Sequence, residues 1–416
     1  MEDAYYERCA GIDVHKKMVV VCLRIGTRKE VREFGTFTHQ LREMVEWLKL
    51  NNCQMAVMES TGSYWKPLYN LFEAVELPVM VGNAQHIRNV PGRKTDVKDA
   101  EWISRLLQQG LIKPSFVPDR EQRDLRDMTR FRKSQIEDRA RNVNRLQKML
   151  EGANVKLAGV LTDIQGQTSQ DLLELVIGKE DITLEDVSKR MRYNIKASAE
   201  DILRSLTGTI TPTQRELFKH IMSVIREQTA QIERTDAMIE SHMSEAYRKA
   251  VEELDTIPGV GRISAQQIVA ETGVDMSHFP TPGQFCSWSG VCPGNSESAG
   301  KRLSGRTNYA NQTLKTTLVQ CAKAAQKNKD SFFFAQYQKL VVRRGKNRAT
   351  VAVAHSMMIA IWHVLKGERY KDLGSDYYFR FSKEKRIGDH FRYLQKLGVK
   401  LPEEVVLAAT KNACTA

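Results

Sequence analysis

Four acidic side chains stand where a metal-dependent reaction on phosphate groups would need them. Asp13 lies in GIDVHKK, at the start of the first apolar segment, and Glu59 ends a later apolar segment in AVMESTG. Asp96 and Asp99 are three residues apart in KTDVKDA. Phosphoryl transfer with two metal ions requires several carboxylates that converge on ions roughly 4 Å apart. The four acids are therefore candidate ligands for Mg²⁺, with Mn²⁺ as the alternative ion.

The elements that must position these acids follow from the apolar patterning. We expect strands at 18–23 and 31–37, a helix at 38–48, a strand at 53–58, a helix at 64–74, a strand at 77–81 and a helix from about 96 to 108. Asp96 and Asp99 would then share one face of a helix start, where the helix dipole favours negative charge. The order predicts a mixed sheet flanked by helices. Each acid taken singly is equally compatible with a solvated side chain or a helix cap.

A second kind of chemistry is suggested by the hydroxyl-rich stretch FCSWSGVCPGNSESAGKRLSGRTNYANQTLK. A serine can attack a phosphodiester when a base or metal takes its proton and cations hold the phosphate. Lys301, Arg302 and Arg306 are the nearby cations. Chemistry alone does not choose the nucleophile, because several serines compete: Ser287, Ser289, Ser296, Ser298 and Ser304.

Other segments have the composition of nucleic-acid contacts. In IPGVGRISAQQI, Gly259 and Gly261 would let backbone N–H groups approach a phosphate next to Arg262, as in a helix-hairpin-helix. The alternative is a tight turn between packed helices. Further candidate contacts are Arg93 and Lys94 beside the acids, Arg130 and Arg141 on a basic helix, and the cations of VVRRGKNRAT. A solvated basic face is the competing interpretation for each of these stretches.

The composition limits the class of protein. The 416 residues carry 63 Lys and Arg against 50 Asp and Glu, a formal net charge of +13 that attracts polyanions. The sequence contains no run of about 18 uncharged apolar residues, so it predicts no membrane span. Its N-terminus begins with acidic residues, which predicts that there is no export signal. Seven scattered cysteines without a C-x-x-C pair predict reduced thiols and no zinc site. We expect a cytoplasmic protein with no membrane partner.

The remaining chain is predicted to be mainly helical. One long basic helix is expected over 119–152 and a second over 213–254, with apolar residues seven apart that suggest a coiled coil. Residues 153–211 show no motif. The predicted domains are 8–118, a helical or coiled-coil region at 119–254 with a middle insert, a C-terminal domain at 255–367, and a basic tail at 368–416.

Three blocks carry a family resemblance. GIDVHK, ESTGSYW and KTDVKDAEWISRL resemble the blocks of the DEDD insertion-sequence transposases, whose N-terminal domain is similar to the Holliday-junction resolvase RuvC. The resemblance implies a ribonuclease H-like domain in which Asp13, Glu59, Asp96 and Asp99 bind the metal. In the family's C-terminal transposase domain, a Glu-Ser followed by small residues matches Glu297 and Ser298, which implies that Ser298 is the nucleophile.

The resemblance also implies the activity. We expect a recombinase of an insertion sequence that cleaves and rejoins DNA, is guided by a structured RNA, and acts as a dimer or tetramer with a composite active site. The alternative is a RuvC-like, metal-dependent junction nuclease that forms no covalent serine intermediate. A non-catalytic nucleic-acid scaffold is a third hypothesis, which the intact set of four acids disfavours.

Overall fold

The computed structural model divides the chain into two compact units, residues 1–118 and 119–416. It describes residues 5–59, 62–82, 99–294, 296–298, 301–304, 306, 307, 310–380, 394 and 397–399. Asp96, Arg93 and Lys94 lie outside the described residues. The division falls at residue 118, where the first predicted domain ends; the further boundaries at 254 and 367 remain predictions.

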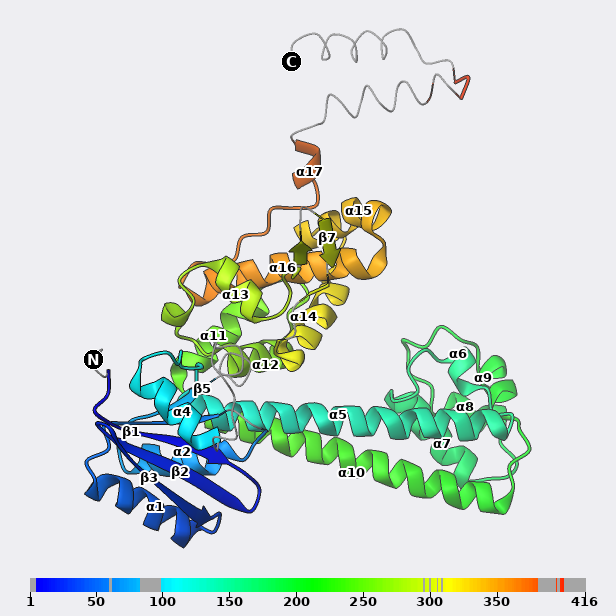
Figure 1. Ribbon diagram of the computed structural model, residues 1–416. Helices are drawn as coiled ribbons and strands as arrows, with labels where there is room; N and C mark the ends of the chain where they lie inside the picture. Colours follow the sequence, from blue (N-terminus) through cyan, green and yellow to red (C-terminus); the bar gives the residue numbers. More distant parts are fainter. Residues whose placement is uncertain are drawn as a thin grey trace. The chain divides into compact units, whose positions relative to one another are not determined.

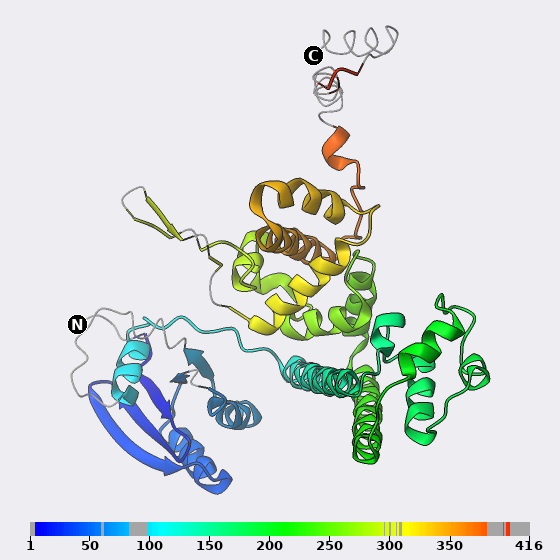
Figure 2. The ribbon, with the colours of Figure 1, turned by 90° about the vertical axis from the view of Figure 1, so that its right-hand side faces the viewer.

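The first unit is a five-stranded mixed sheet with helices on both faces (Figures 1 and 2). Its elements are β1 (Arg8–Val14), β2 (Met18–Ile25), β3 (Arg28–Gly35), α1 (Thr38–Leu50), β4 (Met55–Glu59), α2 (Trp65–Ala74), β5 (Val79–Gly82) and α4 (Asp99–Gln108). The strand order is β3-β2-β1-β4-β5, with antiparallel pairs on the β3 side and parallel pairs on the β5 side. This is the ribonuclease H-like arrangement, and it confirms the expected mixed sheet.

Side chains alternate between the two faces of the sheet along each strand, and apolar residues on both faces form two separate cores. One face of β1 carries Ile12 and Val14, which pack with Met44 of α1 and Phe72 of α2. On the other face Cys9 packs against α4. Because successive strand residues point to opposite faces, β1 is apolar on both faces and lies in the middle of the unit.

The second unit is mostly helical. Its elements are α5 (Arg120–Gly152), α6 (Leu157–Val160), α7 (Gln167–Gly178), α8 (Leu184–Ser188), α9 (Ala199–Leu206), α10 (Pro212–His242), α11 (Glu245–Asp255), α12 (Arg262–Thr272), the 3-10 turn η1 (Met276–His278), α13 (Pro282–Trp288), β6 (Ser296–Ser298), β7 (Lys301–Ser304), α14 (Gln312–Ala325), α15 (Phe332–Arg344), α16 (Lys346–Leu365) and α17 (Tyr377–Arg380).

Helices α5 and α10 pack side by side in opposite directions (Figure 1). Arg132 Nη1 donates to Asp236 at one end of the contact (2.8 Å), and Asn142 Nδ2 donates to Gln228 toward the other (3.0 Å). The residue numbers of the contacting side chains decrease along α10 as they increase along α5, which is the pattern of an antiparallel helix pair. Arg132, which interrupts the apolar seam in the sequence, is only 2% exposed and has its charge matched by α10.

The predicted single helix over 213–254 is wrong, because the chain breaks between α10 and α11. Met243 and Ser244 take extended backbone angles, with ψ of 129° and 169°. The Ser244 N–H donates to Glu121 Oε1 (2.8 Å), so a side chain of α5 replaces the helical hydrogen bond that is lost. The heptad pattern continues up to Ile239 and hides this break in the sequence.

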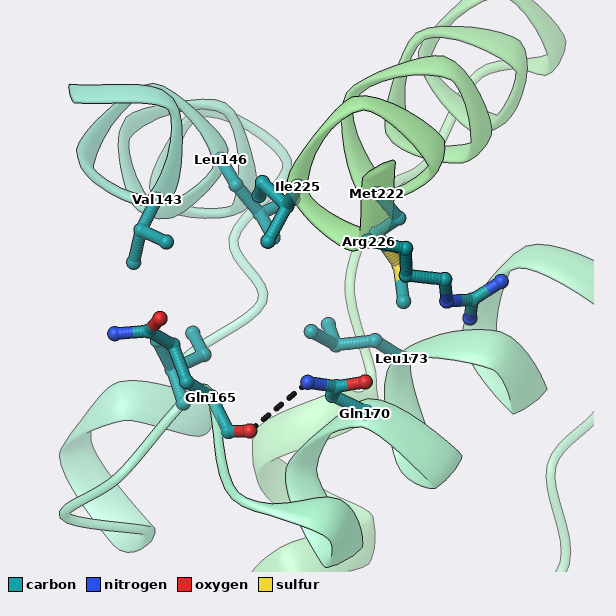
Figure 3. A pocket seen from close by; sticks show the side chains of 9 residues that line it. Val143, Leu146, Gln165, Gln170, Leu173, Met222, Ile225 and Arg226 are labelled. Carbon is teal, nitrogen blue, oxygen red and sulfur yellow. Dashed lines mark hydrogen bonds between the residues drawn. The ribbon is translucent and has the colours of Figure 1, made fainter. Parts of the chain in front are cut away.

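The middle segment forms four short helices with a core of their own. Leu157, Leu172, Val187 and Ile202 of α6 to α9 pack with Phe218 of α10. A small apolar cavity lies between α5, α7 and α10, and Gln170 Nε2 donates to the Gln165 carbonyl at its edge (2.9 Å; Figure 3). The cavity holds none of the predicted site residues, and we interpret it as a packing gap.

Helix α16 is the centre of the last core. It is the one described helix that is long and apolar enough to span a membrane by composition. Val353, Met357 and Ile361 are nevertheless fully buried against the helices around α16, and the Trp362 Nε1–H donates to the Phe279 carbonyl (2.8 Å). The apolar composition of α16 is thus explained by its place in this core.

The start of the predicted basic tail docks on α15. The Phe332 N–H donates to Asp372 Oδ1 (2.9 Å), and Phe332 packs against the rings of Tyr377 and Tyr378. Lys339 Nζ lies 4.1 Å from the centre of the Tyr378 ring, a cation–π contact. Residues up to Tyr378 therefore belong to the folded second unit.

Candidate active site

Asp13 and Glu59 stand at corresponding positions of two neighbouring parallel strands. Ile12 of β1 pairs with Met58 of β4, and the two acids are the next residue of each strand. Side chains at matching positions of adjacent strands point to the same face. The sheet therefore brings these two predicted ligands side by side at the carboxyl ends of β1 and β4.

The face that the two acids share is the one covered by α4. Gly11 lies two residues before Asp13, and a Cβ built on it would come within 2.3 Å of the Ser104 backbone N and 2.4 Å of the Ala100 carbonyl O. Val57, two residues before Glu59, packs with Ile103 and other residues of α4. Asp13 and Glu59 thus belong to the α4 side of the sheet.

The direction of α4 places Asp99 toward the same end. The Gln108 carbonyl, at the end of α4, accepts from the Tyr5 N–H just before β1 begins, whereas Ala100 lies over Gly11 near the other end of β1. Asp99 precedes Ala100 and begins the helix. Three of the four predicted acids therefore come from elements that converge on one corner of the sheet.

A polar network fixes the position of α4 along the sheet. Arg24 Nε of β2 donates to Ser104 Oγ (2.9 Å), and Lys29 Nζ of β3 pairs with Glu101 (2.6 Å). The Ser104 hydroxyl in turn donates to the Glu101 carbonyl (2.8 Å). Because Asp99 is only two residues before Glu101, the network also sets the position of Asp99 at the start of α4.

His15 is a site residue that the sequence analysis missed. Its Nε2 donates to Asp13 Oδ2 at 2.9 Å, while the side chains of Asp13 and His15 are 18% and 57% exposed. The signal was present in the DVH spacing, since residues i and i+2 of a strand share a face. A hydrogen bond from His15 orients the Asp13 carboxylate.

The donor chemistry of this corner fits a hard divalent cation, which prefers carboxylate oxygens. Within the described ranges no three His, Cys, Asp or Glu side chains stand close enough to enclose a metal ion. Asp96, the fourth predicted ligand, falls in the segment 83–98 that is not described.

Ser298 ends the first strand of a short antiparallel hairpin, and Lys301 and Arg302 lie on the second. Ser298 pairs with Lys301 and Glu297 with Arg302, after an irregularity at Ser296. In Figure 2 the two strands, drawn in olive, extend away from the helices of the second unit. The hairpin thus puts the serine beside two cationic residues in backbone register.

The base of the hairpin is fixed to the helical core. The Gly294 N–H donates to the Arg306 carbonyl (2.7 Å), and Pro293 bridges to Thr307. Asn311, four residues beyond Thr307, caps α14 by accepting from the Leu314 N–H (3.1 Å).

Asn311 also reaches a fully buried carboxylate, Glu271 of α12, through a hydrogen bond from Nδ2 (2.6 Å). Arg130 of α5 donates two hydrogen bonds to the same carboxylate, from Nε (2.7 Å) and Nη2 (2.9 Å). Arg126 Nε lies 3.3 Å from Glu271 Oε2. Desolvation would lower the pKa of Arg130, but the hydrogen bonds to Glu271 and the negative charges of Glu271 and Asp127 together outweigh this and raise it. The sequence does not indicate this cluster, because nothing in the local pattern distinguishes Glu271 from an ordinary surface residue near the end of a helix.

Arg130 and Arg141, two predicted nucleic-acid contacts, have protein partners. Arg130 is bound to Glu271, and Arg141 pairs with Asp138 one turn away on α5. Arg306 has an exposed side chain beside the hairpin base. These positions show that the basic composition of α5 is in part structural.

The segment predicted as a helix-hairpin-helix contains two helices, α11 and α12, joined by a tight turn, which is equally the arrangement of the alternative interpretation. Gly259 has φ +88°, and a Cβ there would come within 2.4 Å of the Cys321 carbonyl O of α14, so packing alone requires this glycine. A Cβ on Gly261 would meet nothing within 4 Å. Arg262 donates two hydrogen bonds of 2.7 Å to the Glu240 carboxylate, and these lower the pKa of Glu240.

Comparison with known proteins decides the family. Residues 10–155 match a family model described as "Transposase", and residues 251–338 match one described as "Transposase IS116/IS110/IS902 family". The chain is a transposase of the IS110 family. As an IS110 transposase it is a DNA phosphoryl-transfer enzyme that binds DNA, and the DEDD nuclease family of its N-terminal unit implies a divalent metal.

Curated relatives of this IS110 transposase span most of its length. It is 26% identical over 367 residues to the "Probable family 20 transposase" of Pseudomonas aeruginosa, a match that covers 86% of this chain and 93% of the relative. It is 24% identical over 378 residues to the "Transposase for insertion sequence element IS1111A" of Coxiella burnetii, with 87% and 90% covered.

Proposed function

We propose that this transposase is an RNA-guided recombinase that cuts and rejoins DNA with four acids and a serine. The observation that carries the proposal is the convergence of Asp13, Glu59 and Asp99 at one corner of a ribonuclease H-like sheet. Asp96 completes the set through the family resemblance. The protein would act on DNA in the cytoplasm.

The acids would hold Mg²⁺, or Mn²⁺ in its place. When bound, the divalent cations supply charge that activates the attacking oxygen and stabilises the leaving oxygen. The chain's own contribution is positioning: the close contact of Gly11 with α4 sets the position of Asp99, and His15 orients Asp13.

Ser298 would supply the nucleophile. Its Oγ attacks the phosphorus of a DNA phosphodiester, gives its proton to a base, and displaces a deoxyribose oxygen that takes up a proton. The resulting phosphoserine is attacked by the hydroxyl of the partner strand, which releases Ser298 and rejoins the DNA. Lys301 and Arg302, beside Ser298 in strand register, are suited to hold the phosphate.

Other elements would bind the nucleic acids. We propose that the turn at Gly259 and Gly261 acts as a helix-hairpin-helix on DNA, and that Arg93, Lys94 and the exposed cations of α5 such as Arg141 contact the backbone of DNA or of a guide RNA. The antiparallel pair of α5 and α10 would form a coiled-coil stalk of a dimer or tetramer. In such an assembly the acids of one subunit meet the serine of another.

The second candidate function is a RuvC-like junction nuclease that uses the acids alone. It is favoured by the fact that the four acids rest on a longer motif than the serine does. In this case Ser298 is only a residue of the hairpin.

One experiment separates the two. The full-length protein is incubated with Mg²⁺, RNA transcribed from the DNA that flanks the gene, and end-labelled DNA of the element junction. We expect a denaturant-resistant protein–DNA adduct that mass spectrometry maps to Ser298.

Matched variants define the outcome. Ser298→Ala and Asp13→Ala should each abolish the adduct, while Ser304→Ala, on the neighbouring strand of the hairpin, should retain it. Metal-dependent cleavage without an adduct, unchanged in Ser298→Ala, would refute the serine mechanism and establish the nuclease.

A further inference from the structure

The turn between α15 and α16 is a concentrated basic surface of the second unit. Residues 342–348, which we name the basic turn, are all exposed and include four cations: Arg343, Arg344, Lys346 and Arg348. Gly345, with φ +75°, ends α15 and begins α16, so the chain reverses direction tightly here. Both helices are labelled in Figure 1. The turn presents the two cationic pairs on either side of a single residue.

These cations have no acidic partner within the described part of the chain. No Asp or Glu occurs in the sequence between Asp330 and Glu368. Across the described part of the chain, none of the four side chains forms an ion pair or a hydrogen bond. Arg130, Arg141 and Arg262 differ in this respect, since each is bound to a carboxylate. The basic turn therefore keeps all of its charge available to a partner.

Two of the cations also oppose the helix on which they lie. Lys346 and Arg348 are in the first turn of α16, whose N-terminus carries partial positive charge, and no acid lies in that turn to compensate. Arg343 and Arg344 favour the end of α15, but they add repulsion within the cluster. The repulsion among four like charges in six residues would therefore be relieved by an anion outside the chain.

We propose that the basic turn binds the phosphate backbone of duplex DNA. The family establishes DNA as the substrate, and a duplex offers phosphates at a regular spacing that a compact group of exposed cations can contact together. Contacts of this kind set position and affinity without reading sequence. The basic turn would hold flanking DNA on the second unit, outside the hairpin that carries Ser298.

The test uses full-length protein in which Arg343, Arg344, Lys346 and Arg348 are all replaced by Gln. Binding to a labelled duplex of unrelated sequence is measured by anisotropy across a salt series. Each lost phosphate contact lowers the slope of log affinity against log salt by about 0.9, so four contacts lower it by up to roughly 3.6. At low salt we expect affinity to fall roughly tenfold or more.

A matched variant removes the same charge elsewhere. Lys156, Lys189 and Arg204 of the middle segment and Arg226 of α10 are exposed cations, and each pairs with a surface carboxylate. Their replacement by Gln should change the slope by less than about one. Thermal melting of the basic-turn variant should match or exceed that of the wild type, because its cations oppose α16.

Three results would overturn the proposal. An unchanged slope in the basic-turn variant would exclude phosphate contacts there. An equal loss in the matched variant would show that only net charge matters. Loss of binding to a structured RNA, with duplex binding intact, would assign the basic turn to RNA instead.

Discussion

Replacement of Glu271 by Ala tests whether the buried ion cluster holds the second unit together. The carboxylate is fully buried and accepts from Arg130 and Asn311, and Arg126 pairs with it from a side chain that is 19% exposed. Burial lowers the pKa of Arg126, and Glu271 opposes this shift. Without the Glu271 carboxylate, Arg126 would keep its hydrogen bonds to the backbone carbonyls of residues 270 and 271, but its charge would remain largely buried without the carboxylate that compensates it.

The magnitude follows from burial. Removing one partner of a buried ion pair costs about 3–5 kcal/mol. Arg130 is 43% exposed and can turn into water, so we expect the low end, about 3 kcal/mol. For a unit of this size each kcal/mol lowers the melting temperature by about 2 °C, which gives a decrease of about 6 °C.

The assay is calorimetry of the second unit's transition, with Glu174→Ala as the control. Glu174 pairs with Arg226 on the surface, where both side chains are more than half exposed, so its loss should shift the transition by about 1 °C or less. Glu271→Gln keeps the shape and should fall between the two variants. Equal shifts for Glu271→Ala and Glu174→Ala would refute the argument that burial gives this cluster its energy.

Three further predictions follow from the described geometry. Gly11→Ala should destabilise the first unit by about 1–3 kcal/mol, because the added Cβ would lie 2.3 Å from the α4 backbone. Urea unfolding measures this loss. The control is Gly178→Ala, which has open space around the added Cβ and should be neutral or stabilising. Burial raises the pKa of Cys9 to about 12 and that of Cys53 to about 11, from an ordinary 9.0. The folded unit therefore keeps protons that the unfolded chain loses, so its stability should be complete below pH 9 and should fall between pH 9 and about 12; a flat profile in chemical denaturation would contradict this. Asp119→Ala removes the side chain that accepts from the Gln122 N–H (2.7 Å) at the start of α5 and should cost about 1 kcal/mol, whereas Asp119→Asn should restore most of it in the same melting assay.

Strong periodicity explains which elements could be predicted from the sequence. Strands β2 to β5 and helix α5 follow apolar patterns, and α5 matches the helix expected over 119–152 to within one residue. Strand β1 is not among the predicted strands. The corner occupied by Asp13, Glu59 and Asp99 could be anticipated because parallel strands end at one edge. Glu59 ends its strand as expected, whereas Asp13, expected at the start of the first apolar segment, lies instead near the end of β1.

Elements that depend on tertiary packing could not be predicted. The break at Ser244 is set by Glu121, which is more than 120 residues away along the chain. Glu271 is identified only by its burial among residues of α5 and α14, and no local pattern shows that burial. The short helices of the middle segment had a weak signal in the capping box of Thr183 and Asp186, but their apolar residues form a core only together.

The antiparallel pair of α5 and α10 has a practical consequence for protein engineering. Because the helices run in opposite directions, the middle segment leaves and rejoins the pair at one end, and extra chain there does not alter the Arg132–Asp236 or Asn142–Gln228 contacts. The stretch 178–181 within that segment is exposed. A fluorescent or affinity tag inserted between Glu180 and Asp181 would therefore report on the enzyme while leaving the register of the long helices unchanged.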